Sequence, residues 1–318
     1  MVDGRRVLSS TIATQDHLHA VYRGVVPEIA SRAHIENILP VLETCLKDAG
    51  KTLDDIDAIA VAQKPGLIGS LLIGVTAAKA LAWTLGKPLV GVDHVRAHLY
   101  SVLLDSEKQI EFPAVGMVCS GGHTAMYLIK SWTDITRLGG TIDDAVGEAY
   151  DKVAAMLGLG YPGGPILDKL AKTGNPRAVN FPRPLLSRDS LDFSFSGLKT
   201  AVRYHLFGYD NKLNTDRVRS EAELADIAAS FQAACVDVII EKLSRAMRRT
   251  GSKSLIIGGG VSANTGVRQG VMKLSKAVYV PELRFCTDNA AMIAGLGWHL
   301  YESGVRDSLS MDASSVRS

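Results

Sequence analysis

The chain has 318 residues, of which 47% are hydrophobic, so it can bury a large core and suits two lobes better than one compact domain. Its 35 Lys and Arg against 33 Asp and Glu leave a formal net charge of +2, which excludes a dedicated nucleic-acid binder with a strong positive field; a nucleic-acid partner would need a local patch or helper subunits. Four cysteines without a C-x-x-C pair exclude a zinc ribbon and a disulfide framework, and indicate the reducing cytoplasm.

The first 111 residues predict an N-terminal lobe built from alternating strands and helices. Residues 1–10 carry charged side chains and no apolar h-region, which argues against a signal peptide. Short apolar runs after polar turns predict the strands, and longer apolar or amphipathic runs predict the helices. The predicted elements are a strand at 57–62, a helix at 67–85, a strand at 89–92 and a helix at 94–104.

The segment 67–85 is nearly free of charge and approaches the length of a membrane span. It contains Lys79, two internal glycines, Ser and Thr, which disfavour insertion into a bilayer. We therefore interpret it as a helix buried between the sheet and the second lobe, and we expect no membrane association. A membrane helix is the alternative.

His94 and His98 lie four residues apart in a predicted helix, so their imidazoles project from one face and can converge on one metal ion. Ordinary surface or capping positions are the alternative for such a pair. A zinc protease of the H-E-x-x-H type is disfavoured, because Val95 stands where that motif has glutamate.

A second lobe is predicted over residues 112–302, with its last helix packing back on the first lobe. Two apolar runs joined by Ser120-Gly121-Gly122-His123 predict a tight β-hairpin. The Ser-rich segment 303–318 predicts a flexible tail. The predicted strands of this lobe lie at 114–119, 124–129 and 255–257. The predicted helices lie at 144–157, 166–171 and 224–248; a further helix begins at 261, and the last one passes through 293 and 296.

Two glycine-rich turns are candidates for binding phosphate. The turn 120–122 lies between two strands, where glycine lets bare backbone N–H groups approach an anion; an ordinary hairpin turn is the alternative. The turn 258–260 joins a predicted strand to a predicted helix. Its three glycines cost backbone entropy, which the close approach of a ligand would explain.

Two acidic features complete the candidates. Asp144, Glu148 and Asp151 are spaced i, i+4 and i+7, which places three carboxylates on one predicted helix face; a solvated acidic face is the alternative to a ligand site. Farther along, Thr287 or Asp288 could cap the helix that follows. As a carboxylate, Asp288 could equally complete a mixed His and Asp site, which suits iron or zinc.

Taken together, these segments resemble the TsaD family of tRNA threonylcarbamoyladenosine-forming enzymes, formerly described as glycoproteases. The resemblance runs from about Arg5 to about Trp298, and its motifs follow one another in one order. They are GVVPE at 24–28, KPGL at 64–67, HVRAH at 94–98, SGGHT at 120–124, DAVGEAYDK at 144–152, YPGGP at 161–165, FSFSGLKT at 193–200, GGGVSAN at 258–264 and CTDN at 286–289.

The resemblance implies an α/β fold of the actin-like, sugar-kinase-like class, with two lobes of duplicated ribonuclease-H-like topology. It implies transfer of the threonylcarbamoyl group from threonylcarbamoyl-AMP to N6 of the adenosine 3′ of the anticodon, in tRNAs reading codons that begin with A. Carried over residue by residue, it implies that one divalent metal ion, usually iron with zinc as the second candidate, is bound by His94, His98 and Asp288. The adenylate substrate would be bound by Val118, Cys119, Ser120, Gly121, Gly122, Asp151, Gly164, Asp168 and Asn264.

The start of the chain differs from the family pattern, because nothing in it matches the first strand and the S-C-D-E-T-like phosphate hairpin. Residues 1–7 instead resemble a hairpin turn with Asp3-Gly4 at its tip. Since the first strand is central in this topology, its loss predicts a gap in the first lobe's sheet, unpaired strand edges and impaired activity. A start codon placed too far downstream is our first interpretation, and a genuine truncation with lost activity is the second.

Two other functions are compatible with the glycine turns: a small-molecule or sugar kinase of the same fold, and an ATP-binding scaffold of the heat-shock type. Neither predicts the pair His94 and His98 or the motif at 193–200. The resemblance further implies tRNA, TsaB-like and TsaE-like proteins as partners, in the cytoplasm.

Overall fold

The computed structural model describes residues 1–22, 24–186, 189–208 and 219–316, and it divides the chain into two compact units. The first unit comprises Met1–Gln109 and Pro281–Ser318, and the second comprises Ile110–Val280. Residues 281–302 were predicted to belong to the second lobe, with the last helix packing back on the first lobe. The structure groups them with the first unit, because the helix in this segment packs on the strands of that unit.

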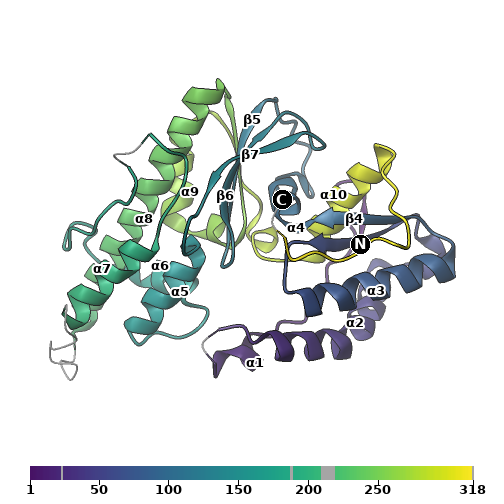
Figure 1. Ribbon diagram of the computed structural model, residues 1–318, viewed down its shortest axis with the longest axis horizontal. Helices are drawn as coiled ribbons and strands as arrows, with labels where there is room; N and C mark the ends of the chain where they lie inside the picture. The colour runs from purple at the N-terminus through teal and green to yellow at the C-terminus, as the bar shows by residue number, and fades with distance from the viewer. Residues whose placement is uncertain (23, 187–188, 209–218, 317–318) are drawn as a thin grey trace. The chain divides into compact units, whose positions relative to one another are not determined.

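A five-stranded sheet forms the centre of the second unit, in the order β7-β6-β5-β8-β9 (Figure 1). β5, β6 and β7 are antiparallel neighbours, whereas β8 is parallel to β5, and β9 to β8. Three antiparallel strands followed by two parallel ones make the expected ribonuclease-H-like topology. The strands are β5 (Ala114–Cys119), β6 (Thr124–Ile129), β7 (Ile135–Gly140), β8 (Ser254–Gly258) and β9 (Ala277–Tyr279).

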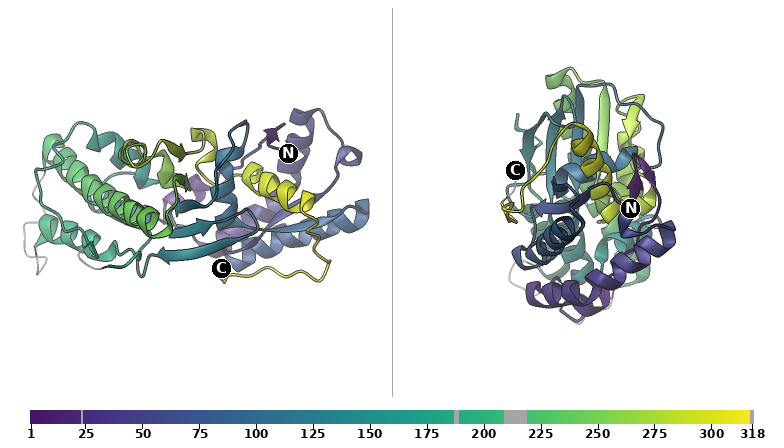
Figure 2. Two further views of the ribbon diagram at one scale, coloured as in Figure 1. Left: turned by 90° about the horizontal axis from the view of Figure 1, so that it is seen from above. Right: turned by 90° about the vertical axis from the view of Figure 1, so that its right-hand side faces the viewer.

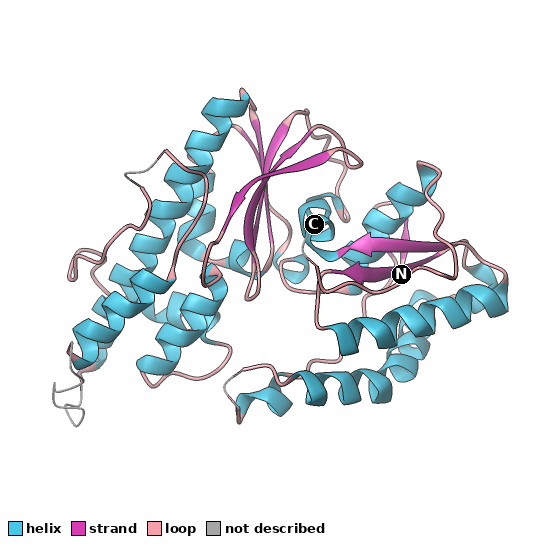
Figure 3. Cartoon of the chain, in the orientation of Figure 1, coloured by secondary structure: helices cyan, strands magenta, loops and turns pink. Residues whose placement is uncertain are grey.

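The helices of this unit gather on one side of the sheet (Figure 3). Successive residues of a strand point to opposite faces, so Val115, Met117 and Cys119 of β5 share one face, and all three are buried in the core that these helices complete. The helices are α5 (Val146–Met156), α6 (Gly163–Ala171), α7 (Ser196–Phe207), α8 (Glu221–Thr250) and α9 (Thr265–Val271), with the 3-10 turn η3 (Gly260–Ala263) before α9.

Two parallel strands, β3 (Ile59–Lys64) and β4 (Leu89–Asp93), lie between two helices of the first unit. A Cβ added to Gly74 of α3 (Ile68–Leu85) would meet Val61, whereas one added to Gly297 of α10 (Ala290–Glu302) would meet Ala60. Since neighbouring strand residues point to opposite faces, α3 and α10 cover opposite faces of the pair. The remaining elements are α1 (Asp16–Ala20), α2 (Pro27–Ala49), η1 (Leu53–Asp55), α4 (His94–Tyr100), η2 (Ser101–Leu103) and η4 (Leu283–Phe285).

The first residues form the predicted hairpin, in which β1 (Val2–Asp3) pairs with β2 (Arg6–Val7). Among the described residues, this hairpin and the pair β3-β4 are separate two-stranded sheets. The free edge of β4 is partly covered, because Leu89 makes an isolated antiparallel bridge to Asp307 near the end of the chain.

The segment 303–316 is held against the first unit rather than forming the predicted flexible tail (Figure 2). Asp307 accepts a hydrogen bond from the backbone N–H of Gly91 at 2.8 Å, and the N–H of Ser314 donates to the carbonyl of Gln63 at 3.0 Å. Met311 is buried beside α3. The segment has few large apolar residues, which predicts disorder. Hydrogen bonds from its backbone and from Asp307 hold it in place instead.

Helix α3 is less buried than its composition predicts. Val75, Ala78 and Ala82 of this helix are buried, but Trp83 is 76% exposed. Within the described residues, it is the helix long and apolar enough to cross a membrane, which by itself is weak evidence for a span. The prediction of a buried helix is therefore wrong for the side that carries Trp83.

Candidate functional site

Helix α4 presents the two histidines because its first turn is capped from the strand before it. Asp93 ends β4, and its carboxylate accepts hydrogen bonds from the N–H groups of Val95 and Arg96 at 2.9 and 3.0 Å. This cap starts the helix at His94. His94 and His98 are therefore one turn apart on the same face, as predicted.

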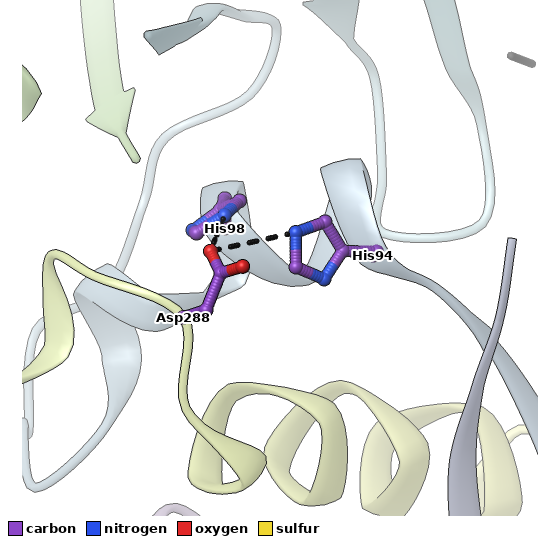
Figure 4. A group of neighbouring side chains, drawn as sticks. All are labelled: His94, His98 and Asp288. Carbon is purple, nitrogen blue, oxygen red and sulfur yellow. Dashed lines mark ion pairs between the residues drawn. The ribbon is translucent and has the colours of Figure 1, made fainter. Parts of the chain in front are cut away.

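Asp288 reaches the same place from the other end of the first unit's sequence. Neither Thr287 nor Asp288 caps the next helix, as the sequence allowed; Asn289 does, accepting from the N–H of Met292 at 2.9 Å. The Asn289 amide also donates to the carbonyl of Thr287 at 2.8 Å, so it spans Asp288. The Asp288 carboxylate is thereby left to face the histidines (Figure 4).

Replacing Asn289 by alanine should lower the free energy of unfolding by about 1 kcal/mol, because the cap of α10 is lost. It should also weaken divalent-metal affinity about tenfold, because residues next to ligands orient them. Asn289→Ser, which keeps a capping oxygen but not the bond to Thr287, should unfold like the unchanged protein and bind metal more weakly. Thermal unfolding and Co²⁺ titration measure both effects; unchanged metal affinity in the alanine variant would show that Asn289 only caps.

The three side chains form a compact donor set. Asp288 Oδ1 lies 3.5 Å from His94 Nε2 and 3.1 Å from His98 Nε2, and one ligand atom from each residue lies within 4.8 Å of the others. Ligands bonded at roughly 2.0–2.2 Å to one zinc-like ion would be about 3.0–3.5 Å apart along a polyhedron edge, so the spacing fits a shared ion.

The surroundings of His98 also fit a metal. Its ring is fully buried, and neither ring nitrogen has a hydrogen bond of acceptable geometry. Burial lowers the pKa of His98, which favours the neutral imidazole that metals bind. A buried imidazole whose nitrogens make no hydrogen bond is costly, and a bound ion would remove that cost. Two imidazoles and a carboxylate are ligands typical of iron and zinc.

The turn 120–122 closes the β5-β6 hairpin in the second unit. The N–H of Ser120 donates to the carbonyl of His123 at 2.7 Å, and the Ser120 hydroxyl accepts from the N–H of His123 at 3.1 Å. Gly121 and Gly122 are exposed, and a Cβ added to either would meet nothing within 4 Å. Two hydrogen bonds between Ser120 and His123 thus close the turn, and the space beside its glycines is open.

Two other glycines bring backbone close to this turn. A Cβ added to Gly147, near the start of α5, would lie 2.6 Å from the carbonyl oxygen of Ser120. One added to Gly259, after β8, would lie 2.4 Å from the carbonyl oxygen of Cys119. Because β5 and β8 are parallel, the turn, the start of α5 and the 258–260 loop meet at one edge of the sheet. The two predicted glycine turns are therefore brought together.

The other predicted binding residues of this unit lie in two hydrogen-bonded groups. Asp151 accepts from the N–H of Gly163 at 2.8 Å, at the start of α6 where Gly164 also lies; burial raises the pKa of Asp151 against the effect of these backbone groups. Asn264 caps α9 by accepting from the N–H of Val267 at 3.0 Å. The side chains of Val118 and Cys119 are fully buried, so their backbone is what they can offer a ligand.

Asp168 and Asn264 are joined through Gln232 of α8, a residue that sequence reasoning missed. The Gln232 amide donates to Asp168 at 3.0 Å and accepts from Asn264 at 2.7 Å. A glutamine within a long amphipathic helix carries no local motif, so only the packing of α6, α8 and α9 reveals its place.

The predicted acidic face on α5 is wrong in one respect. The helix begins at Val146 rather than at 144, so Asp144 lies before it. Asp144 forms ion pairs with Lys152 at 3.0 Å and with Lys199 at 2.7 Å, so two positive charges compensate its negative charge. The motif at 193–200 supplies Lys199, as well as the Ser194 and Ser196 groups that bond Asp143.

Comparison with known proteins gives consistent matches. The model of the family TsaD, tRNA N6-adenosine threonylcarbamoyltransferase, matches residues 6–295. The tRNA N6-adenosine threonylcarbamoyltransferase of Trichlorobacter lovleyi is 48% identical over 318 residues, which cover 99% of this chain and 91% of that protein. The one of Treponema denticola is 47% identical over 316 residues, covering 98% and 91%.

Among solved structures, the chain is similar to HypF of T. kodakarensis, with a TM-score of 0.58 and 16% identity over 84% of this chain. A full-length HypF in its phosphate- and nucleotide-bound form gives a TM-score of 0.56 and 14% identity over 83% of this chain. The chain spans 43% and 41% of those two longer chains. At this level of identity the likeness concerns the fold.

Proposed function

The chain belongs to the tRNA N6-adenosine threonylcarbamoyltransferase family, TsaD, and from this membership we propose its reaction and the residues that carry it. The enzyme modifies tRNA. In the proposed reaction, N6 of the adenosine 3′ of the anticodon attacks the carbamoyl carbon of threonylcarbamoyl-AMP, and AMP leaves. The tRNAs are those reading codons that begin with A.

Membership confirms the resemblance noted in the sequence, the actin-like α/β fold, and the assignment to an acyltransferase of tRNA. It does not favour the small-molecule kinase or the ATP-binding scaffold. The relatives also lend no support to impaired activity, because the chain spans 91% of the length of the first of them.

His94, His98 and Asp288 are the proposed ligands of one divalent metal ion, Fe²⁺ with Zn²⁺ as the second candidate. The observation that supports them is the fully buried His98 ring, whose nitrogens make no hydrogen bond, beside a carboxylate at ligand spacing. When bound, such an ion would supply positive charge that polarises the acyl donor. The protein's part is to hold the three donors in place through the caps Asp93 and Asn289.

The adenylate is proposed to bind at the edge of the second unit's sheet. Residues 118–122 would line its phosphate, because Gly121 and Gly122 leave open space for an anion beside the turn. Asp151, Gly164, Asp168 and Asn264 would contact the rest of the molecule. Their support is that hydrogen bonds bring them together: Asp151 bonds the start of α6, and Gln232 joins Asp168 to Asn264.

The proposed partners are tRNA and proteins similar to TsaB and TsaE, and the proposed location is the cytoplasm. The small net charge of +2 supports a need for helpers, because it provides little long-range attraction for tRNA.

Replacing Gly121 by alanine tests the phosphate site against an ordinary turn. The added methyl meets nothing within 4 Å in the protein, so the free energy of unfolding should change by less than about 1 kcal/mol. The methyl would occupy the space proposed for the phosphate, and affinity for AMP and for threonylcarbamoyl-AMP should fall about tenfold or more.

Gly197→Ala is the matched control, because its Cβ also meets nothing within 4 Å. It should bind AMP like the unchanged protein in isothermal titration calorimetry. If Gly121→Ala does so too, the turn is an ordinary hairpin.

A further inference from the structure

We propose that Gln232 is a positioning residue for the adenylate site, because its amide fixes Asp168 and Asn264 at the same time. The proposal rests on the proposed function, in which those two residues contact the adenylate. Gln232 itself is not a ligand in it. Its role is to hold two ligands that come from different helices in one arrangement.

The contacts of Gln232 use both ends of its amide. Its Nε2 donates to Asp168 Oδ1 at 3.0 Å, and its Oε1 accepts from Asn264 Nδ2 at 2.7 Å. The hydroxyl of Tyr150, a buried residue of α5, donates to the same Oε1 at 3.4 Å. One side chain of α8 therefore contacts residues of α5 and α6 and the cap of α9.

Asp168 is oriented from a second direction by the residue after Asn264. The Thr265 N–H donates to Asp168 Oδ1 at 3.2 Å, and the Thr265 hydroxyl donates to Oδ2 at 2.9 Å. Gln232 and Thr265 thus both donate to the Asp168 carboxylate, Lys172 of α6 pairs with it at 3.7 Å, and Asn264 is linked to it through Gln232. A displacement of α6 against α9 would break more than one of these bonds together.

This arrangement requires an amide at position 232. A carboxylate could accept from Asn264, but it would place negative charge about 3 Å from Asp168, where a donor is required. An apolar side chain would leave Asp168 and Asn264 each with one partner fewer. A side chain that merely filled space would not need a donor at one end and an acceptor at the other.

The test is Gln232→Glu, which keeps the shape and the acceptor and replaces the donor. Near pH 8 the new carboxylate should repel Asp168, and the Kd for AMP and the KM for threonylcarbamoyl-AMP should rise about tenfold, with kcat and the KM for tRNA little changed. Because the nearby Asp168 should raise the pKa of the new carboxyl, protonation near pH 5 restores a donor, and the ratio of variant to unchanged protein should return towards one. The charged or titratable groups near this position include Asp168 and Lys172 of α6 and Tyr150 of α5, and Cys235 of α8 and Cys119 of β5 lie near Tyr150.

Two further variants separate the alternatives. Gln269→Glu makes the same chemical change on an exposed position of α9 and should bind AMP like the unchanged protein at both pH values. Asp168→Asn should weaken AMP binding if the adenylate site is where we place it. Thermal unfolding of each variant checks that the fold is retained.

The outcomes are distinct. If AMP binding is weakened near pH 8 but not near pH 5 in Gln232→Glu, and is unchanged in Gln269→Glu, the positioning role is supported. AMP binding that is unchanged in Gln232→Glu but weakened in Asp168→Asn overturns this inference and leaves the adenylate site standing. An equal loss at both pH values with a lower unfolding temperature overturns it in favour of a general structural role. Unchanged binding in both Gln232→Glu and Asp168→Asn overturns the proposed adenylate site, and the inference with it.

Discussion

Replacing His98 by alanine is expected to abolish metal binding and threonylcarbamoyl transfer together. His98 is the buried member of the donor set, and its removal leaves His94 and Asp288 as a two-ligand set open to solvent. Affinity for Fe²⁺ or Zn²⁺ should fall by more than about a hundredfold, because even the loss of a neighbour that only orients a ligand costs about 10- to 100-fold. The rate of transfer should fall by a similar factor if the ion polarises the donor.

The measurement is metal content by elemental analysis, together with threonylcarbamoyladenosine formed in tRNA. His17→Ala is the matched control, because His17 is exposed and lies outside the donor set. AMP binding by His98→Ala checks that the second unit is intact. A variant that loses its metal and keeps full transfer would contradict the metal's role.

Replacing Gly259 by alanine should disrupt both the fold and the adenylate site. Gly259 has a φ of 88°, which side chains rarely adopt, and its Cβ would lie 2.4 Å from the Cys119 carbonyl oxygen. Neither strand can yield easily, because β5 and β8 are paired neighbours in the buried sheet. We expect the free energy of unfolding to fall by about 2–4 kcal/mol and AMP affinity to fall at least about tenfold.

Gly158→Ala separates the two causes. Gly158 also has a positive φ, of 73°, but its Cβ would meet nothing within 4 Å. It should cost only the conformational penalty, about 1 kcal/mol, and leave AMP binding unchanged. Equal losses in the two variants, measured by chemical denaturation and calorimetry, would show that the close approach of Gly259 to Cys119 does not matter.

The strands of the second unit could be predicted closely because their sequence signals are local. The apolar runs at 114–119 and 124–129 coincide with β5 and β6, and the polar turn between them fixes the hairpin. Helix starts were harder to place. The predicted helix at 144–157 begins two residues later, because Asp144 is drawn to Lys152 and Lys199, and Lys199 is far away in sequence.

Tertiary contacts decided the parts that local patterns could not. The segment 303–316 reads as a flexible tail, yet Asp307 and Ser314 bond to residues more than two hundred positions earlier. The apolar segment at 67–85 reads as buried, yet it packs on β3 and α2 and leaves Trp83 exposed.

The candidate site shows the same division. The spacing of His94 and His98 predicts their shared face, because four residues make about one helical turn. Nothing local joins Asp288 to them; α10 must first pack beside α4, and Asn289 must take over the cap. The family resemblance supplied that link. Gln232 had no such motif, so its contacts emerged from the packing of three helices.

We expect this chain to form threonylcarbamoyladenosine in tRNA. The direct measurement is mass spectrometry of nucleosides from the tRNA of a strain depleted of its own enzyme and supplied with this chain. We predict that the modified nucleoside returns in tRNAs reading codons that begin with A, and that His98→Ala does not restore it. If the tRNA stays unmodified although the folded chain accumulates alongside TsaB-like and TsaE-like proteins, the claim is contradicted.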